Sequence, residues 1–338
     1  MAKEWSPESL PDLSGSVALV TGGSAGIGLD TARHLALRGA RVYFTAMTAA
    51  EATSVRETVL AENVSISSAQ FIPLVFDLTD LASIAKLVDD VKANEDKLHI
   101  LVNNAAIVPF SYELTKNGWE RAMATAHVGH FALTNWLMPL LKNAAEDPKA
   151  DVRIISVASN VNYEILPAKF PLDYTSPEIL TGKYPYTPWQ HRLLQLIMTT
   201  KHMFLYAMSK LANVMFAKEL QRRLDEQGSS ILSISLHPGL VGTEFMMELW
   251  VSWIHPFLTR SFWSSDKGAH HTLMVAADPS IRARAEEVKG QYLEPNGKLV
   301  LAHPISRDEN QVRGFWDVTT EALNETLAEQ GLPVLLDW

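Results

Sequence analysis

The sequence contains no cysteine among its 338 residues. Disulfides, thiolate nucleophiles and metal sites with cysteine ligands are therefore excluded. Any redox chemistry would have to come from a bound cofactor. A chain without cysteine also fits the cytoplasm, which is the location we expect.

Positive charge is scarce too: the sequence has 29 Lys and Arg residues and 38 Asp and Glu residues, which gives a net charge of −9. A chain of this charge has no general attraction to nucleic acids or anionic membranes, so we expect neither as a partner.

Long hydrophobic runs are also missing. The stretch 246–263 is interrupted by Glu248, Pro256 and Arg260, and residues 1–13 carry charges where a signal peptide would be apolar. We therefore expect no integral membrane segment.

What is present is a regular alternation of short apolar runs with longer segments suited to helices. The runs are 17–20, 41–45, 70–76, 99–103, 152–158 and 231–236. This alternation predicts a parallel sheet covered on both faces, a doubly wound α/β fold. Among the helices, we expect one after Asp80, one over 118–141 and one over 203–227.

No break in composition, flexible linker or internal repeat divides the chain. We therefore expect a single domain over 1–338, with the surplus length in insertions. An insertion at 160–205 and a cover at 246–263 are both rich in aromatic residues and Met. We expect both segments to surround a substrate site.

A glycine-rich turn, 21–28 with the sequence TGGSAGIG, follows the first apolar run and opens the first helix. Glycines let the backbone turn sharply and let a diphosphate approach, while N–H groups and the helix dipole attract its charge. The candidates for binding a dinucleotide are Gly22, Ser24, Gly26, Ile27 and Gly28. The alternative interpretation is a tight turn between strand and helix with no ligand.

The GxxxGxG spacing resembles that of the short-chain dehydrogenase/reductase family, and later segments fit the same family. Residues 103–106, NNAA, resemble its NNAG motif, and Asp77-Leu78 resembles its acidic position near the adenine. The resemblance runs from about residue 14 to 323. It implies a Rossmann-type fold in which Asp77, Leu78 and Asn104 border the adenosine.

The end of the second predicted strand, 43–48 with the sequence YFTAMT, bears on the choice of cofactor. An acid there would bind the ribose 2′-hydroxyl of NAD and repel the 2′-phosphate of NADP. No acid is present in this stretch, and the Arg that NADP-using relatives commonly carry at the position of Met47 is absent too. NADP(H) is therefore favoured over NAD(H), with hydroxyl contacts from Thr45 and Thr48.

Tyr206 and Lys210 are four residues apart, so in a helix they lie one above the other. An ammonium near a Tyr hydroxyl favours the phenolate, which suits acid–base catalysis. The YxxxK spacing alone is also common in surface helices, but 206–224 resembles the retinol-dehydrogenase-like branch of the family. The resemblance implies that Tyr206 protonates the substrate oxygen and that Lys210 binds the nicotinamide ribose and lowers the pKa of Tyr206. It implies that Ser159 holds the substrate oxygen.

The segment 237–243, HPGLVGT, matches the family's HPG segment. The resemblance implies that Pro238, Gly239, Val241 and Thr243 contact the nicotinamide carboxamide. Taken alone, Pro-Gly indicates only a turn.

One residue departs from the family pattern. Ala126 stands where relatives carry the Asn of the catalytic tetrad, which is thought to hold a water in a proton relay to the Lys. A water, His127 or His130 would have to replace it. As a metal pair these two His lack a nearby third ligand, so we expect no metal.

These observations predict an NADP(H)-dependent oxidoreductase that interconverts a ketone or aldehyde and an alcohol. The aromatic segments at 160–205 and 246–263 predict a bulky hydrophobic substrate, with an oligomer interface or a peripheral membrane contact as the other interpretations. The long insertion suggests secondary metabolism, and the oligomeric state is left open. The alternative functions are a cyclase, isomerase or dehydratase on the same scaffold, and a binding protein with a weakened site.

Overall fold

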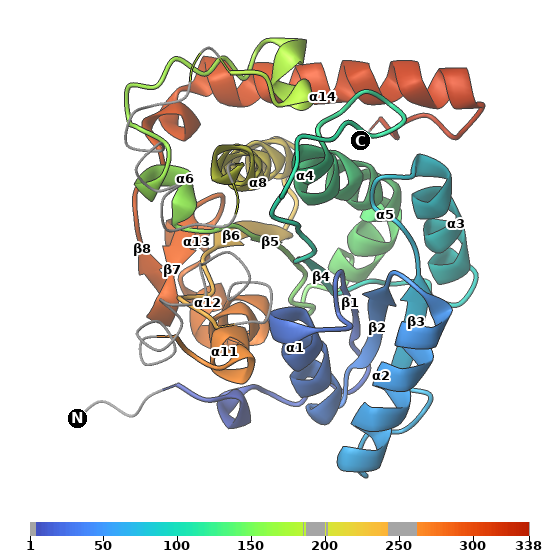
Figure 1. Ribbon diagram of the computed structural model, residues 1–338. Helices are drawn as coiled ribbons and strands as arrows, with labels where there is room; N and C mark the ends of the chain where they lie inside the picture. Colours follow the sequence, from blue (N-terminus) through green and yellow to red (C-terminus); the bar gives the residue numbers. More distant parts are fainter. Residues whose placement is uncertain (1–4, 185, 187–199, 201, 243–261, 338) are drawn as a thin grey trace.

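The computed structural model describes residues 5–184, 186, 200, 202–242 and 262–337 (Figure 1). Within these ranges one eight-stranded sheet runs in the order β3-β2-β1-β4-β5-β6-β7-β8. The strands are β1 Val17–Val20, β2 Arg41–Ala46, β3 Phe71–Val75, β4 Ile100–Asn103, β5 Arg153–Val157, β6 Leu232–Leu236, β7 Tyr292–Glu294 and β8 Lys298–Leu299. Neighbouring strands pair in parallel, except that β8 is antiparallel to β7. The predicted doubly wound α/β fold is confirmed.

Helices cover both faces of this sheet, with α1 and α11 on one side and α5, α8 and α14 on the other (Figure 1). The helices are α1 Gly26–Leu37, α2 Ala49–Glu62, α3 Leu81–Lys92, α4 Arg121–Met123, α5 Gly129–Ala145, α6 Val161–Glu164, α8 Met203–Glu226, α11 Ser265–Ala277, α12 Pro279–Ala283, α13 Ala285–Val288 and α14 Glu309–Gln330. Shorter helical turns are η1 Pro7–Ser9, η3 Pro177–Thr181, η5 Pro295–Gly297 and η6 Pro304–Arg307. None of the helices in the described ranges is long and apolar enough to cross a bilayer.

The strands alternate their side chains between two hydrophobic cores. Leu19 and Leu101 point into the core under α5 and α8, whereas Val20 and Val102 point into the core under α1 and α11. Because both faces are buried, these strands are apolar at most positions, which made them recognisable in the sequence.

The predicted helices are largely confirmed. Asp80 caps α3 by accepting the Ala82 N–H at 3.2 Å, and α8 follows the predicted span closely. The predicted helix over 118–141 corresponds to an unbroken helical run from α4 into α5, but its π-helical segment η2, Ala124–Val128, was not predicted. A π turn contains one residue more than an α turn, and sequence periodicity over so short a span does not reveal it.

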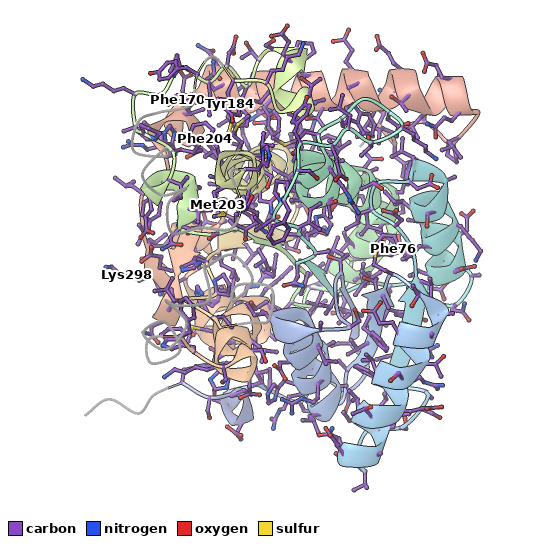
Figure 2. All side chains as sticks on the ribbon, in the orientation of Figure 1. Phe76, Phe170, Tyr184, Met203, Phe204 and Lys298 are labelled. Atoms are coloured by element: carbon purple, nitrogen blue, oxygen red, sulfur yellow. The ribbon has the colours of Figure 1, made fainter. Side chains whose placement is uncertain are left out.

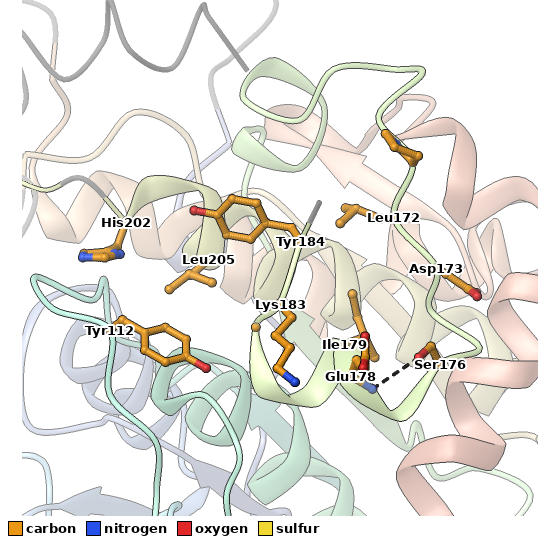
Figure 3. A pocket seen from close by; sticks show the side chains of 12 residues that line it. Tyr112, Leu172, Asp173, Ser176, Glu178, Ile179, Lys183, Tyr184, His202 and Leu205 are labelled. Carbon is orange, nitrogen blue, oxygen red and sulfur yellow. Dashed lines mark hydrogen bonds between the residues drawn. The ribbon is translucent and has the colours of Figure 1, made fainter. Parts of the chain in front are cut away.

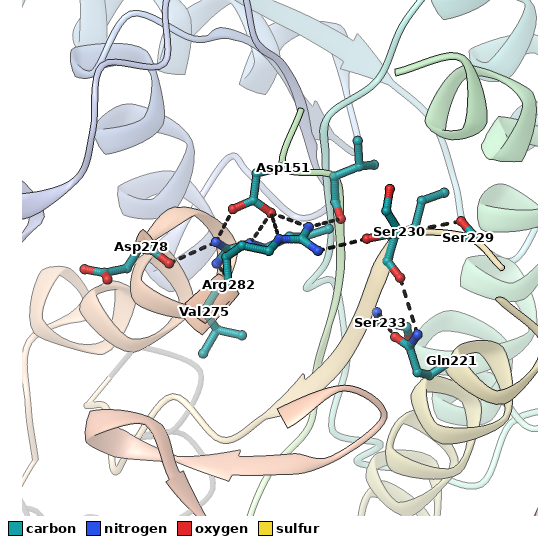
Figure 4. A network of polar contacts seen from close by, with 11 residues as sticks. Asp151, Gln221, Ser229, Ser230, Ser233, Val275, Asp278 and Arg282 are labelled. Carbon is teal, nitrogen blue, oxygen red and sulfur yellow. Dashed lines mark hydrogen bonds and ion pairs between the residues drawn. The ribbon is translucent and has the colours of Figure 1, made fainter. Parts of the chain in front are cut away.

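A buried ion cluster fixes the start of β5, the strand that leads to Ser159 (Figure 4). The guanidinium of Arg153 is fully buried and donates to the carbonyls of Val275 at 2.8 Å and Asp278 at 2.9 Å. Asp151 pairs with Arg153 and, through a 2.8 Å bond from Nε, with Arg282. These bonds tie β5 to α11 and α12, so the strand is held before its functional end is reached.

Candidate cofactor and catalytic site

The glycine-rich turn between β1 and α1 has a backbone that larger residues would not allow. Gly22 and Gly26 have φ values of +62° and +53°, which L-residues with a side chain rarely adopt. A Cβ on Gly28 would lie 2.1 Å from the carbonyl oxygen of Gly22, closer than any real contact. The three glycines thus let the turn fold against the start of its own helix.

The N-terminus of α1 is left without a side-chain cap. Its N-cap residue, Ala25, makes no capping hydrogen bond, and the first turn holds no acid. By contrast, Thr48, Asp80 and Ser264 cap α2, α3 and α11 with side-chain oxygens. Uncapped N–H groups beside a glycine cradle suit an anion such as a diphosphate, so these residues fit a dinucleotide. The predicted Ser24 and Ile27, both partly exposed, lie in the turn and in the first turn of α1.

Neighbouring strands hold this turn in place. The N–H of Gly22 donates to Thr45 Oγ1 at 2.8 Å, which comes from β2. Asn104, after β4, donates from its side-chain amide to the carbonyl of Thr21 at 2.8 Å and, over 3.4 Å, to that of Gly22. The turn is therefore fixed by its backbone groups, and Asn104 acts through the turn's carbonyls.

The predicted adenine-side residues, Asp77 and Leu78, follow β3, and Leu78 contacts the start of α5. Asp77 accepts the N–H and the hydroxyl of Thr79, both at 2.8 Å, through Oδ1. Leu78 is buried, and its carbonyl lies so close to Gly129 that a Cβ there would approach it to 2.3 Å. The bonds to Thr79 thus orient Asp77, while Leu78 packs closely against Gly129, the first residue of α5.

The first turn of α2 brings to the end of β2 a carboxylate that the prediction missed. Met47 is 61% exposed, and its N–H donates to Glu51 Oε2 at 3.0 Å. Thr48 Oγ1 accepts the N–H of Glu51 at 3.2 Å, which resembles a capping box, except that Glu51 binds the N–H of the residue before the N-cap. The T-x-x-E spacing was the sequence feature that could have revealed it. Thr45 and Thr48 each accept one backbone N–H group, and each keeps its hydroxyl proton for a cofactor.

Lys210 and Tyr206 of α8 meet at the carboxyl end of β5. The Nζ atom of Lys210 donates to the carbonyl of Val157 at 2.8 Å, and Asn213 donates to the same oxygen at 3.1 Å. Lys210 Nζ lies 5.5 Å from the centre of the Tyr206 ring. Asn213 was not predicted, although it continues the same face of the helix at i+3 from Lys210.

Burial sets the protonation of this pair. It lowers the pKa of Lys210 to about 7 and raises the pKa of Tyr206 above its usual value of 10. The expectation that Lys210 lowers the pKa of Tyr206 is therefore not met in the chain without cofactor. The physical reason is that loss of hydration opposes charge on both groups. Tyr206 holds its proton at neutral pH and is an acid that can give it up to a substrate oxygen.

Ser159 follows β5 by two residues, at the same edge of the sheet. Its hydroxyl makes only long contacts, 3.4 Å to Asn160 Oδ1 and 3.4 Å from the N–H of Val161. Its carbonyl is held firmly by the side-chain amide of Asn162 at 2.6 Å. The backbone of Ser159 is thus fixed, while its hydroxyl keeps most of its hydrogen-bonding capacity.

The segment after β6 forms a covered turn. Gly239 has a φ of +101°, and a Cβ there would approach the Trp263 ring to 2.4 Å. Trp263 pairs with the turn through its N–H to the carbonyl of Leu240 at 2.8 Å. The predicted Pro238 and Val241 are buried in this turn, whereas Thr243 lies outside the described residues. So does the predicted cover 246–263, apart from its last two residues.

Ala126 is buried in η2, and the two neighbouring His residues have other partners. His127 points to α14, where Nε2 bonds to Thr319 Oγ1 at 3.0 Å and the ring stacks on Phe315 at 4.3 Å. His130 bonds to Thr21 Oγ1 at 2.8 Å and to the carbonyl of Ala126 at 2.9 Å. The side chain of His127 is therefore directed away from the proposed relay, and both ring nitrogens of His130 are engaged.

A cavity of about 730 Å³ opens beside the first turn of α8 (Figure 3). His202 and Leu205 line it, and His202 lies one helical turn before Tyr206 on the same face. Among the described residues, every lining residue except Tyr112 belongs to 160–205. The others are Pro171, Leu172, Asp173, Ser176, Glu178, Ile179, Gly182, Lys183 and Tyr184. The lining is a mixture of apolar, hydroxyl and charged groups.

Some of the aromatic residues expected around the substrate belong to the core instead. Tyr174 is fully buried and donates to the carbonyl of Met208 at 2.8 Å. Phe170 packs edge-on against Phe204, which also contacts Tyr184, and these three lie together in Figure 2. The insertion thus uses part of its aromatic content to attach itself to α8, which composition alone does not show.

Comparisons with known proteins bear on the family to which the chain belongs. Residues 16–168 match the model of the short chain dehydrogenase family. The chain is 36% identical to the short chain dehydrogenase/reductase dpchH of Colletotrichum higginsianum, over 97% of this chain and 80% of that protein. It is 31% identical to human retinol dehydrogenase 12, over 92% of this chain and 87% of that protein. A solved structure of a putative uncharacterized protein from Mycobacterium Paratuberculosis superposes with a TM-score of 0.67 at 26% identity, covering 95% and 97% of the two chains.

Family members are oxidoreductases that depend on a nicotinamide dinucleotide. The match to the Colletotrichum protein covers nearly the whole chain. The chain belongs to the short-chain dehydrogenase/reductase family, in its retinol-dehydrogenase-like branch.

Proposed function

We propose that this protein is an NADP(H)-dependent reductase that converts a ketone or aldehyde on a bulky substrate into an alcohol, and that it also catalyses the reverse reaction. The observation that carries the proposal is the meeting of Tyr206, Lys210 and the Ser159 backbone at the carboxyl end of β5. Ligands of doubly wound folds bind at this edge of the sheet.

The proposed site residues divide between binding and proton transfer. The glycine-rich turn and α1 hold the diphosphate, and Lys210 together with the turn at 238–241 binds the nicotinamide end. The bound dinucleotide supplies a hydride. Ser159 orients the substrate oxygen through its weakly engaged hydroxyl. Tyr206, whose raised pKa keeps its proton at neutral pH, donates that proton to the oxygen.

The preference for NADP(H) rests on the end of β2, which carries no acidic side chain between residues 43 and 48. Glu51 opposes this preference, because its carboxylate is bound to the N–H of Met47 beside the proposed ribose site. The preference is therefore smaller than an Arg at position 47 would give, and it is measured by a paired titration with NADPH and NADH.

The cavity beside α8 supports a bulky substrate, since its volume of about 730 Å³ is typical of pockets that bind drug-sized ligands. Its lining refines the substrate class. The cavity is lined by apolar side chains, Leu172, Ile179 and Leu205, and by polar ones, Tyr112, Glu178 and Lys183. The substrate that we propose is therefore mostly apolar and carries polar substituents. We place the protein in the cytoplasm, as a single domain over 1–338, in a pathway of secondary metabolism.

The decisive experiment measures binding and turnover with the purified chain. NADPH and NADH are titrated by fluorescence and by thermal shift, and bulky ketones and aldehydes are then tested for consumption of the reduced cofactor. Binding of NADPH with reduction of carbonyl substrates is expected. Failure of both cofactors to bind would contradict the proposal and favour a binding protein with a weakened site. Product formation without cofactor consumption, retained in Tyr206→Phe, would favour a non-redox enzyme.

A further inference from the structure

His130 lies beside the π-helical segment η2 and the glycine-rich turn, and it bonds to Thr21, which also binds Asn104. It comes from the first turn of α5, directly after the π-helical segment η2, and its exposed fraction is 2%. A π turn widens the spacing of backbone hydrogen bonds, so a carbonyl within it is open to a side chain. Here the Nδ1 atom of His130 bonds to the carbonyl of Ala126 at 2.9 Å.

The other ring nitrogen, Nε2, bonds to Thr21 Oγ1 at 2.8 Å. This hydroxyl also accepts the N–H groups of Asn104 at 2.9 Å and Ala105 at 3.0 Å. Its oxygen is therefore used as an acceptor, and its proton is directed to the imidazole or to the more distant carbonyl of Val102 at 3.3 Å. Because two N–H groups already use the acceptor sites of Thr21 Oγ1, the shorter bond to His130 Nε2 is one in which Thr21 donates and His130 accepts.

The bonds around His130 determine its tautomer. A carbonyl only accepts, so the proton on the ring lies on Nδ1 and points to Ala126. The Nε2 atom then accepts the proton of Thr21. Burial lowers the pKa of His130 to about 4, so the ring is neutral at pH 7 and this arrangement is stable.

The chain of bonds continues into the glycine-rich turn. Asn104, held by Thr21 Oγ1 through its backbone, uses its side-chain amide to hold the carbonyls of Thr21 and Gly22. One neutral imidazole therefore connects η2 to the turn proposed to bind the diphosphate. In this chain η2 contains Ala126, which has no side-chain amide to make such a connection.

We propose that His130 is a positioning residue for the cofactor: it fixes the π turn around Ala126 against Thr21 and so keeps the Thr21–Asn104–Gly22 turn in its binding shape. The proposal rests on the proposed function, because it takes this turn to be the dinucleotide site. His130 acts through hydrogen bonds on both nitrogens, and it neither touches the substrate nor transfers a proton.

The test compares His130 with His127, a matched control three residues away with the same exposed fraction of 2%. His127 also has a buried bond, to Thr319, but it faces α14 instead of the turn. His130→Phe and His127→Phe are purified, their folded fractions are determined by circular dichroism, and Kd values for NADPH and NADH are measured by fluorescence titration.

We expect H130F to raise the Kd of both cofactors about tenfold or more, because two buried hydrogen bonds of the network are lost. The KM for cofactor should rise likewise, with kcat at saturating cofactor changing less than about threefold. H127F should lower the melting temperature and leave the Kd within about twofold. His130→Asn, which keeps a donor for the Ala126 carbonyl but does not reach Thr21, should fall between wild type and H130F.

Equal changes of Kd in H130F and H127F, or an unchanged Kd in folded H130F, would overturn the role of His130. If H130F does not fold, the milder pair H130N and H127N decides in the same way. Failure of the wild-type chain to bind either cofactor is a different result, because it contradicts the proposed function itself.

Discussion

The two sides of the proposed site are built differently. On the cofactor side, the turn after β1 is fixed by backbone groups: the N–H of Gly22 bonds to Thr45, and the carbonyls of Thr21 and Gly22 bond to Asn104. On the substrate side, a cavity of about 730 Å³ is lined by side chains of an insertion, and several of them, such as Glu178 and Lys183, are exposed. In the cofactor turn the backbone geometry allows few residue types at each position, whereas the positions that line the cavity allow many.

The difference has a chemical consequence. Every dinucleotide presents the same diphosphate, so a turn that binds it through N–H groups serves one purpose in many proteins. Substrates differ, and a cavity formed by an insertion can change its lining without disturbing the sheet. We therefore expect substitutions on the two sides to have separable effects, on cofactor affinity on one side and on substrate range on the other.

The largest effect should come from the proposed proton donor. Tyr206→Phe keeps the ring beside Lys210 but removes the proton donor, so kcat/KM should fall about 10³-fold. Cofactor affinity should change by less than about twofold. Steady-state kinetics and fluorescence titration measure the two quantities. A variant that keeps a tenth of the wild-type activity would show that Tyr206 is not the acid.

A substitution in the cofactor turn should separate binding from chemistry. Gly28→Ala places a Cβ 2.1 Å from the Gly22 carbonyl, so the turn must move and the Kd for NADPH should rise about 100-fold. The matched control is Gly228→Ala, whose φ of +66° is also unfavourable but whose Cβ meets nothing within 4 Å. G228A should cost about 1 kcal/mol of stability and leave the Kd unchanged. Equal Kd values in the two variants would contradict this account.

These two sides also explain what sequence reasoning could find. The buried strands were predictable because both faces are apolar, and the glycine-rich turn and the Tyr206–Lys210 spacing were predictable because backbone geometry restricts them. The family followed from these segments together. Their placement at one edge of the sheet follows from parallel topology.

The rest depends on contacts that the sequence does not encode locally. The π segment η2 differs from an α-helix by one residue per turn, and the bond of His130 to Thr21 joins residues 109 positions apart. The role of Tyr174 in the core depends on its contact with Phe315 of α14. Composition therefore identified an aromatic insertion and assigned some of its residues to the wrong surroundings.

A change in the cavity wall should affect only the substrate side. Glu178 is exposed and lines the cavity, so Glu178→Trp would fill part of it without disturbing the core. We expect kcat/KM for bulky carbonyl substrates to fall about tenfold, and that for a small aldehyde and the Kd for cofactor to stay unchanged. Glu321→Trp, at an exposed position of α14, is the control. A parallel loss for small and bulky substrates would show that the cavity does not select by size.

The burial of Lys210 predicts a pH dependence of stability. Its pKa is lowered from 10.5 in an unfolded chain to about 7 in the folded one, so the unfolded state binds more protons between these values. Stability therefore rises with pH from about 7 to about 10.5, by at most about 1.4 kcal/mol per pH unit from this group. Lys210→Met should remove this increment, as measured by urea unfolding at several pH values. The same slope in both proteins would contradict the burial of a neutral amine.

The smallest effect should come from the carboxylate at the rim of the cofactor side. Glu51→Gln keeps an acceptor for the N–H of Met47 but removes a negative charge near the proposed 2′-phosphate. The Kd for NADPH should fall about threefold relative to that for NADH, since an exposed charge pair contributes less than about 1 kcal/mol. The effect should shrink as salt is added, because added ions screen exposed charges. Glu57→Gln, on the same helix and exposed, should leave the ratio unchanged. A shift of the ratio toward NADH in E51Q would place the ribose elsewhere and remove the electrostatic argument for the cofactor preference.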